Sequence, residues 1–316
     1  IEVPFDLSQV LFITTANSLD TVSRPLLDRM EIIELSGYTS NEKFHIAKDY
    51  LVKKSMKNNG LDDNDLTISD DAIEAVIGYY TREAGVRKLE QQIGKICRKA
   101  VKKLLENTER PIEVTKQNLE EYLGKERFHF EKMNEQDEIG VARGLAWTSV
   151  GGDTLSIEVN VMPGSGKVEL TGKLGDVMKE SAMAAISYIR ANSQKLGIAE
   201  NFHKTKDIHI HVPEGAVPKD GPSAGITMAT AVVSALTKNP VRNDIAMTGE
   251  ITLRGRVLPI GGLKEKSLAA FRAGITDIII PNENKADIDD VPKEVRSKIN
   301  FIPVKSMDTV LENALR

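Results

Sequence analysis

The sequence contains a single cysteine, Cys97, so the chain cannot form an intramolecular disulfide. A chain without disulfides is typical of a reducing compartment, and we expect a cytoplasmic protein. No run approaches the roughly 18 to 20 apolar residues that a membrane-spanning helix needs, so no membrane segment is predicted. The net charge of −4 argues against a dedicated nucleic-acid binder, although it leaves room for a local basic face.

The chain has 316 residues, which is enough for two or three domains with separate cores. Its content of 41% hydrophobic and 28% charged residues is ordinary for a globular protein. The chain opens on Ile1 and not on methionine, so we interpret it as part of a longer protein.

The first residues predict the end of an α/β unit. Residues 10–15 (VLFITT) form a short, apolar, β-branched run, which predicts a buried strand. Residues 24–30 predict a short helix, and residues 31–35 predict a second short strand.

The following region predicts helices. Thr39 and Glu42 form a capping-box pattern ahead of an apolar run. A second helix is expected to open at Asp70, and a third, with apolar residues at helical spacing, at Gly85. Up to about residue 125 we therefore expect a unit made of helices alone.

Residues 125–138 are charged and lack an apolar period, which predicts a domain boundary there. Beyond it, strand and helix patterns are mixed, which favours an α+β domain over a regular βαβ repeat. The expected strands are 154–161, 167–171, 207–212, 245–248, 257–259 and 277–281, and the expected helices are 176–196, 223–237, 264–273 and 307–315.

One segment of this domain suggests catalysis. Residues 213–225 (PEGAVPKDGPSAG) follow a predicted strand and place Ser223 among small residues at the start of a predicted helix. Free backbone N–H groups and the positive end of the helix dipole would face an oxyanion there. A plain helix-capping serine explains the same segment, so the pattern alone leaves both readings open.

A serine nucleophile needs a base that takes its proton. All five histidines lie upstream of Ser223, and His209 and His211 share one strand face from which either could reach the turn. The segment 258–266 (LPIGGLKEK) offers Lys264 and Lys266 at a helix start, where the dipole opposes a positive charge and favours a lowered pKa. Surface lysines and ordinary buried histidines remain the alternatives. No third ligand accompanies the histidine pair, so no metal site is expected.

Three motifs, PKDGPSAG, MTGEITLRG and LPIGGLKEK, resemble in order and spacing the protease domain of Lon from about Gly140 to the end. The resemblance implies a fold similar to domain 2 of ribosomal protein S5. It also implies a Ser–Lys dyad, in which Ser223 attacks the scissile carbonyl and Lys266 takes and returns the proton. Thr248 would hydrogen-bond the lysine, and Asp220 would set the geometry of the turn.

The chain departs from the family at Ser149, where many relatives carry Glu. Ser149 has no carboxylate with which to take that supporting role.

The N-terminal part resembles the end of the AAA+ core of Lon, through TTANS and RPLLDRMEII. The resemblance implies that Asn17 polarises the water attacking ATP and that Arg29 is an arginine finger offered to a neighbouring subunit. YTREAGVRKLE resembles the second sensor, with Arg87 facing the phosphates. The implied domains are the end of the AAA+ core (1–37), the helical lid (38–127) and the proteolytic domain (128–316).

No G-x-x-x-x-G-K-[ST] motif occurs, so this chain is not expected to hydrolyse ATP, and peptide hydrolysis by it should need no cofactor. By resemblance, the complete protein would use ATP and Mg²⁺ to thread unfolded proteins into a homohexameric ring. It would degrade misfolded and regulatory proteins in quality control and stress response.

Other interpretations stay open. Helix 87–110 has eight basic and three acidic residues, which predicts either a solvated lid face or a DNA-contacting surface. A noncatalytic Lon-like domain would assemble or bind DNA. A Ser-His-Asp hydrolase would use His209 or His211. Ser40 and Lys43 match an S-x-x-K pattern, but the capping box explains them better.

Overall fold

The computed structural model describes residues 6–16, 19, 22–33, 37–106, 110–128, 136–148, 151–213 and 219–316. The chain divides into two compact units, residues 1–36 and residues 37–316. Within the second unit we refer to residues 37–128 as the helical domain and to residues 136–316 as the C-terminal domain.

The first unit contains one short helix, α1 (Arg24–Leu27), among its described residues. The strand predicted over 10–15 is wrong, since these residues adopt no regular structure and Leu11 and Ile13 are each 83% exposed. A strand is stable only beside a hydrogen-bonded neighbour, and the described residues offer none. Residues 31–33 form no strand either, and residues 34–35 lie outside the described residues.

The helical domain begins with the capping box at Thr39 and Glu42, which is confirmed by both of its hydrogen bonds. Most of its predicted helices are present, and two of them continue as π-helical turns. The elements are α2 (Ser40–Ile46), η1 (Ala47–Leu51), α3 (Val52–Asn58), β1 (Leu66–Ile68), α4 (Asp70–Ala75), η2 (Val76–Tyr80), α5 (Arg87–Leu105), β2 (Ile112–Val114) and α6 (Leu119–Leu123).

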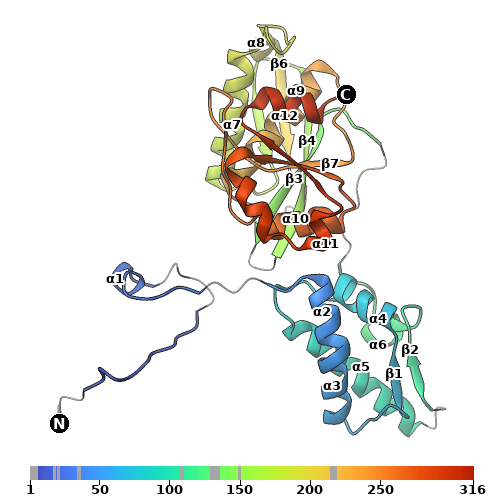
Figure 1. Cartoon of the computed structure of the whole chain (residues 1–316). Helices are drawn as coiled ribbons and strands as arrows, with labels where there is room; N and C mark the ends of the chain where they lie inside the picture. The colour runs from blue at the N-terminus through green and yellow to red at the C-terminus, as the bar shows by residue number, and fades with distance from the viewer. Residues whose placement is uncertain are drawn as a thin grey trace. The chain divides into compact units, whose positions relative to one another are not determined.

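The core of this domain forms around α5 (Figure 1). Its apolar stripe, including Leu89, Ile93 and Ile96, is buried because these residues recur on one helix face. The expectation of helices alone is incomplete. Strands β1 and β2 form a parallel pair with Leu66 opposite Ile112.

The C-terminal domain is built on a sheet in which the described residues form seven strands, in the order β11-β10-β7-β3-β4-β6-β5 (Figure 1). Strands β11, β10, β7 and β3 run parallel, β4 is antiparallel to both β3 and β6, and β5 is parallel to β6. The strands are β3 (Val141–Thr148), β4 (Gly151–Pro163), β5 (Val168–Thr171), β6 (Lys206–His211), β7 (Ile245–Met247), β10 (Asp277–Pro281) and β11 (Asn300–Val304).

Helices cover both faces of this sheet, because apolar side chains alternate along its central strands. On β10, Ile279 faces one apolar cluster while Ile278 and Ile280 face another. The first cluster includes α7 (Asp176–Ala191), α9 (Gly225–Thr237) and α12 (Met307–Ala314), and the second includes α10 (Leu263–Arg272) and α11 (Lys293–Arg296). The short elements are α8 (Phe202–Thr205), η3 (Pro222–Ala224), β8 (Glu250–Ile251), β9 (Val257–Leu258) and η4 (Asn282–Asp290).

The predicted α+β class is confirmed. Helix α7 ends at Ala191, earlier than the predicted 196, and its last turn is closed by Asn192, whose backbone N–H bonds the carbonyls of Tyr188 and Ile189. Throughout the described part of the chain, no helix is both long and apolar enough to cross a membrane.

Candidate active site

Ser223 lies in the one-turn helix η3, directly before α9. Gly221 has a φ of 127°, which L side chains rarely adopt, and Pro222 begins the turn. Gly225 is needed because a Cβ there would lie 2.8 Å from the Ile251 side chain. Ser223 is partly exposed, and none of the described residues hydrogen-bonds its hydroxyl.

Asp220 fixes the turn from the other side. Its carboxylate accepts hydrogen bonds from the backbone N–H of Met178 at 3.0 Å and of Gly221 at 2.9 Å. The first of these satisfies a free N–H in the first turn of α7. Asp220 therefore ties the segment before Ser223 to the start of α7.

The end of β7 lies beside Ser223. The backbone N–H of Gly249 donates to the Ser223 carbonyl at 2.8 Å, and that of Thr248 donates to the Ile279 carbonyl at 3.1 Å. Ser223 is thus held where the parallel strands β7 and β10 end. This carboxyl edge is where sites form in open α/β sheets.

Lys266 is in the first turns of α10, after Gly262 in a left-handed conformation at the N-cap. The side chain is buried, with 3% of its surface exposed, and Nζ donates to Thr248 Oγ1 at 3.1 Å. Burial lowers the pKa of Lys266 to about 8, while the nearby Glu265 carboxylate opposes the fall. The sequence predicts a lowered pKa because of the helix dipole. In the structure, the main cause of the lowered pKa is desolvation of the buried amine.

Thr248 connects the two predicted catalytic residues. Its Oγ1 accepts from Lys266 and lies 3.5 Å from the Ser223 carbonyl oxygen. No hydrogen bond joins the Ser223 hydroxyl to Lys266 Nζ, although both residues meet at the same strand end. Catalytic hydrogen bonds are often long in a free enzyme and tighten when substrate binds.

The histidine pair faces away from this site. Ile208 and Ile210 on β6 join the cluster that includes α9, so His209 and His211 project from the opposite face of the sheet. Both rings hydrogen-bond Thr171 Oγ1, at 2.9 and 2.6 Å. From the sequence, either histidine is a candidate base for Ser223. In the structure, both lie on the sheet face opposite the helix that begins after Ser223.

Two of the three predicted nucleotide-sensing residues are among the described residues. Asn17 lies outside them, Arg29 is exposed in the first unit, and Arg87 is exposed as the first residue of α5. Ser149 also lies outside the described residues.

Asn284 is a supporting residue that the sequence analysis missed. Its buried amide accepts from the Ile260 backbone N–H at 2.9 Å and donates to the Ile260 carbonyl at 2.7 Å. It also donates to Asp287 at 2.6 Å. These bonds fix the segment that leads into α10 and Lys266. The sequence offers one indication of this role, since Asn284 is a polar residue that follows shortly after the strand predicted at 277–281.

Two family models match the chain. The Lon protease (S16) C-terminal proteolytic domain matches residues 113–316, and the Lon protease AAA+ ATPase lid domain matches residues 57–112.

Curated Lon proteases match over all or nearly all of the chain. It is 59% identical over 316 residues to the Lon protease of Clostridioides difficile (strain 630), covering 100% of this chain and 40% of that relative. It is 59% identical over 315 residues to Lon protease 1 of Bacillus subtilis (strain 168), covering 100% of this chain and 41% of that relative. The chain thus spans about 40% of the length of these relatives. Together with the two matching domains, these identities show that the chain belongs to the Lon protease family.

Proposed function

We propose that this chain hydrolyses peptide bonds as a serine endopeptidase, with Ser223 as the nucleophile and Lys266 as the general base. The observation that carries the proposal is the buried Lys266 amine beside the Ser223 turn, with a pKa lowered to about 8. At neutral pH such an amine is neutral about 300 times more often than a solvated lysine. A neutral amine can accept the serine proton, whereas a charged one cannot.

The reaction follows from these positions. Ser223 Oγ attacks the scissile carbonyl carbon as its proton moves to Lys266 Nζ, and the N-terminal end of α9 favours the negative oxygen that forms. Lys266 then gives the proton to the leaving amine, which leaves an acyl ester on Ser223. Water, deprotonated by the same amine, hydrolyses the ester and restores the serine. Thr248 orients Lys266 through the 3.1 Å hydrogen bond.

For the complete protein, we propose an ATP-dependent protease that degrades misfolded and regulatory proteins in the cytoplasm. The family membership supports an assembly, expected to be a homohexamer, into which unfolded substrates are threaded. Asn17, Arg29 and Arg87 are proposed to sense the nucleotide there. The sequence has no phosphate-binding loop, so ATP hydrolysis is not proposed for this chain alone.

The test is cleavage of casein by the chain and by two variants, Ser223→Ala and Lys266→Met, with retention of fold checked by circular dichroism. We expect both variants to lose at least a thousandfold in kcat. His211→Ala, which removes a ring on the opposite sheet face, is the matched control and should cleave at the parent rate. If Lys266→Met cleaves normally while His211→Ala does not, the base is a histidine and this proposal is wrong.

The noncatalytic alternative, with DNA binding through residues 87–110, has less support. On α5, Lys95 and Lys99 donate to the backbone carbonyls of Leu123 and Glu121, and Lys103 donates to the Glu121 carboxylate. These contacts direct part of the basic face toward α6. A salt-dependent shift of DNA mobility by residues 37–128, without proteolysis by the chain, would favour this alternative.

A further inference from the structure

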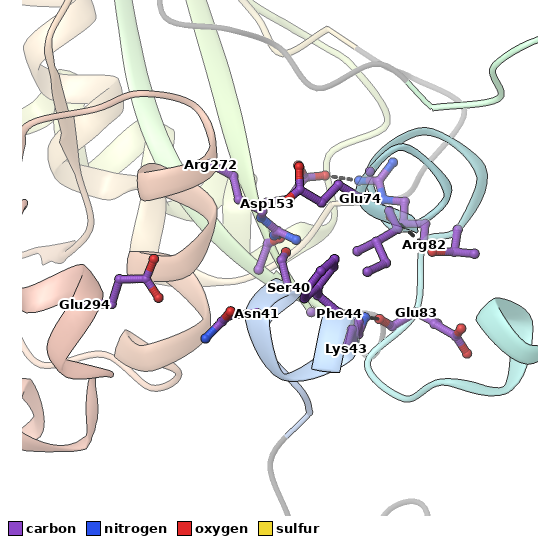
Figure 2. Close-up of a pocket in the computed structure, with 15 residues that line it drawn as sticks. Ser40, Asn41, Lys43, Phe44, Glu74, Arg82, Glu83, Asp153, Arg272 and Glu294 are labelled. Carbon is purple, nitrogen blue, oxygen red and sulfur yellow. Dashed lines mark hydrogen bonds and ion pairs between the residues drawn. The ribbon is translucent and has the colours of Figure 1, made fainter. Parts of the chain in front are cut away.

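A cavity of about 390 Å³ lies within the second unit, between the helical domain and the C-terminal domain (Figure 2). Charged side chains of both signs line it. The cations are Lys43, Arg82 and Arg272, and the carboxylates are Glu74, Glu83, Asp153 and Glu294. Because both signs are present in nearly equal number, the cavity is better suited to holding two domains together than to selecting a charged ligand.

An ion pair crosses this cavity. Arg82 of the helical domain hydrogen-bonds the Asp153 carboxylate of β4, and Figure 2 shows the two side chains pointing toward each other. Both side chains are only about a third exposed, at 37% and 29%. A half-buried arginine–carboxylate pair has more geometric specificity than an exposed lysine pair.

Arg82 is presented from a rigid segment. The preceding residue, Thr81, is buried and donates to the Ile77 carbonyl at 3.1 Å. The following residue, Glu83, accepts from the first turns of α5, through the backbone N–H of Lys88 at 3.0 Å and of Leu89 at 2.8 Å. Arg82 therefore moves with the start of α5.

On the other side of the cavity, the start of β4 rests on the helix that carries Lys266. A Cβ on Gly152 would lie 1.9 Å from the Glu265 carbonyl oxygen and 3.0 Å from the Lys266 backbone nitrogen, so only glycine fits this close contact. Arg272, on the same helix, donates to the Gly152 carbonyl at 2.8 Å. Asp153, the next residue, is the one that Arg82 binds.

We propose that Arg82 is a positioning residue for proteolysis, because by binding Asp153 it keeps Gly152 against α10 and so keeps Lys266 away from water. The inference rests on the proposed function, in which Lys266 is the base. It gives the helical domain a direct influence on the catalytic site, through an arginine that touches neither substrate nor nucleophile. Arg87 also lies at the start of α5. A movement of Arg87 would therefore shift Arg82 and its ion pair with Asp153.

The experiment measures the rate at which a fluorophosphonate phosphonylates Ser223, with loss of fluoride, from pH 6 to pH 10.5 in the 316-residue chain and its variants. If Arg82→Ala admits water to Lys266, the pKa of Lys266 rises toward its ordinary value. For a rise of about one unit in this pKa, phosphonylation at pH 7 becomes about tenfold slower, and the rates converge above about pH 10. In casein cleavage, kcat should fall while KM stays the same.

Two further variants separate positioning from general damage to the fold. The exchange Arg82→Asp with Asp153→Arg restores the pair in reverse and should recover most of the parent rate and midpoint. Arg110→Ala removes another arginine–aspartate pair, with Asp65, that lies wholly in the helical domain. It is the matched control and should leave the pH profile unchanged.

The outcomes are distinct. An unchanged midpoint in Arg82→Ala, or a charge exchange that recovers nothing, overturns the positioning role while leaving the dyad intact. A parent that is not phosphonylated at any pH, or phosphonylation that survives Lys266→Met, overturns the proposed function and the inference with it.

Discussion

The buried Lys266 should reduce the stability of the C-terminal domain at neutral pH, and replacing it with methionine should therefore stabilise the protein while abolishing catalysis. Lys266 is 3% exposed, and burial lowers its pKa from 10.5 to about 8. Because one pKa unit corresponds to about 1.4 kcal/mol, keeping this lysine charged in the folded state costs about 3 kcal/mol. Loss of its hydrogen bond to Thr248 removes about 1 kcal/mol, which leaves a net gain of about 2 kcal/mol for Lys266→Met.

The gain should depend on pH in a defined direction. Below about pH 8 the lysine is charged in both the folded and the unfolded chain, so the full penalty is present. Between about pH 8 and 10.5 the folded state is neutral while the unfolded state is still charged. The stability of the parent therefore rises with pH relative to that of Lys266→Met. Above about pH 10.5 the gain disappears.

Urea denaturation followed by tryptophan fluorescence measures this effect in the relevant domain. Trp147 is the single tryptophan of the sequence and lies on β3. The matched control is Lys264→Met, two residues earlier on the same helix and partly exposed, which should change stability by less than about 0.5 kcal/mol. A Lys266→Met variant that is less stable than the parent at pH 7, or a difference that does not change with pH, would refute the reasoning.

Three further results are expected. Gly152→Ala should destabilise the C-terminal domain by more than about 2 kcal/mol in urea denaturation and lower casein cleavage, because its Cβ would collide with the Glu265 carbonyl. Asp220→Ala removes the acceptor for the Met178 backbone N–H and should lower stability by about 1 kcal/mol in the same assay; an unchanged value would mean that this bond is unimportant. If Lys266 is the base, as proposed, the rate of fluorophosphonate labelling of Ser223 in the parent should rise with pH to a midpoint near pH 8, and a midpoint near pH 6.5 would instead indicate a histidine.

The sequence predicts the helices of this fold well because their apolar spacing is local. The α5 stripe and the Thr39 capping box are both readable from neighbouring residues, and both are present. Strands depend on partners that are distant in sequence. The three-residue strands β1 and β2 were missed for this reason, and β3, whose pattern is interrupted by the buried Arg143, was missed as well. Residues 10–15 show the reverse case, a strand-like pattern that has no partner among the described residues.

The candidate site likewise has features that could be predicted from the sequence and features that could not. Ser223 and Lys266 could be selected from motif and resemblance, and both lie at the end of β7. The burial of Lys266 could not be read from the sequence, since it depends on how α10 packs against the sheet. The contact of Gly152 with α10 and the bonds of Asn284 to Ile260 join segments that are far apart in the chain, so neither has a local signal.

The exposed apolar residues of the first unit affect how the protein should be handled. Leu11, Phe12 and Ile13 are 83%, 67% and 83% exposed and lie in a β-branched run with no charge. Such runs pair readily with copies of themselves at high concentration. Turbidity on concentration should therefore come from this segment and not from the folded domains. A chain that begins at Gly37, where the second compact unit starts, should stay clear under the same conditions.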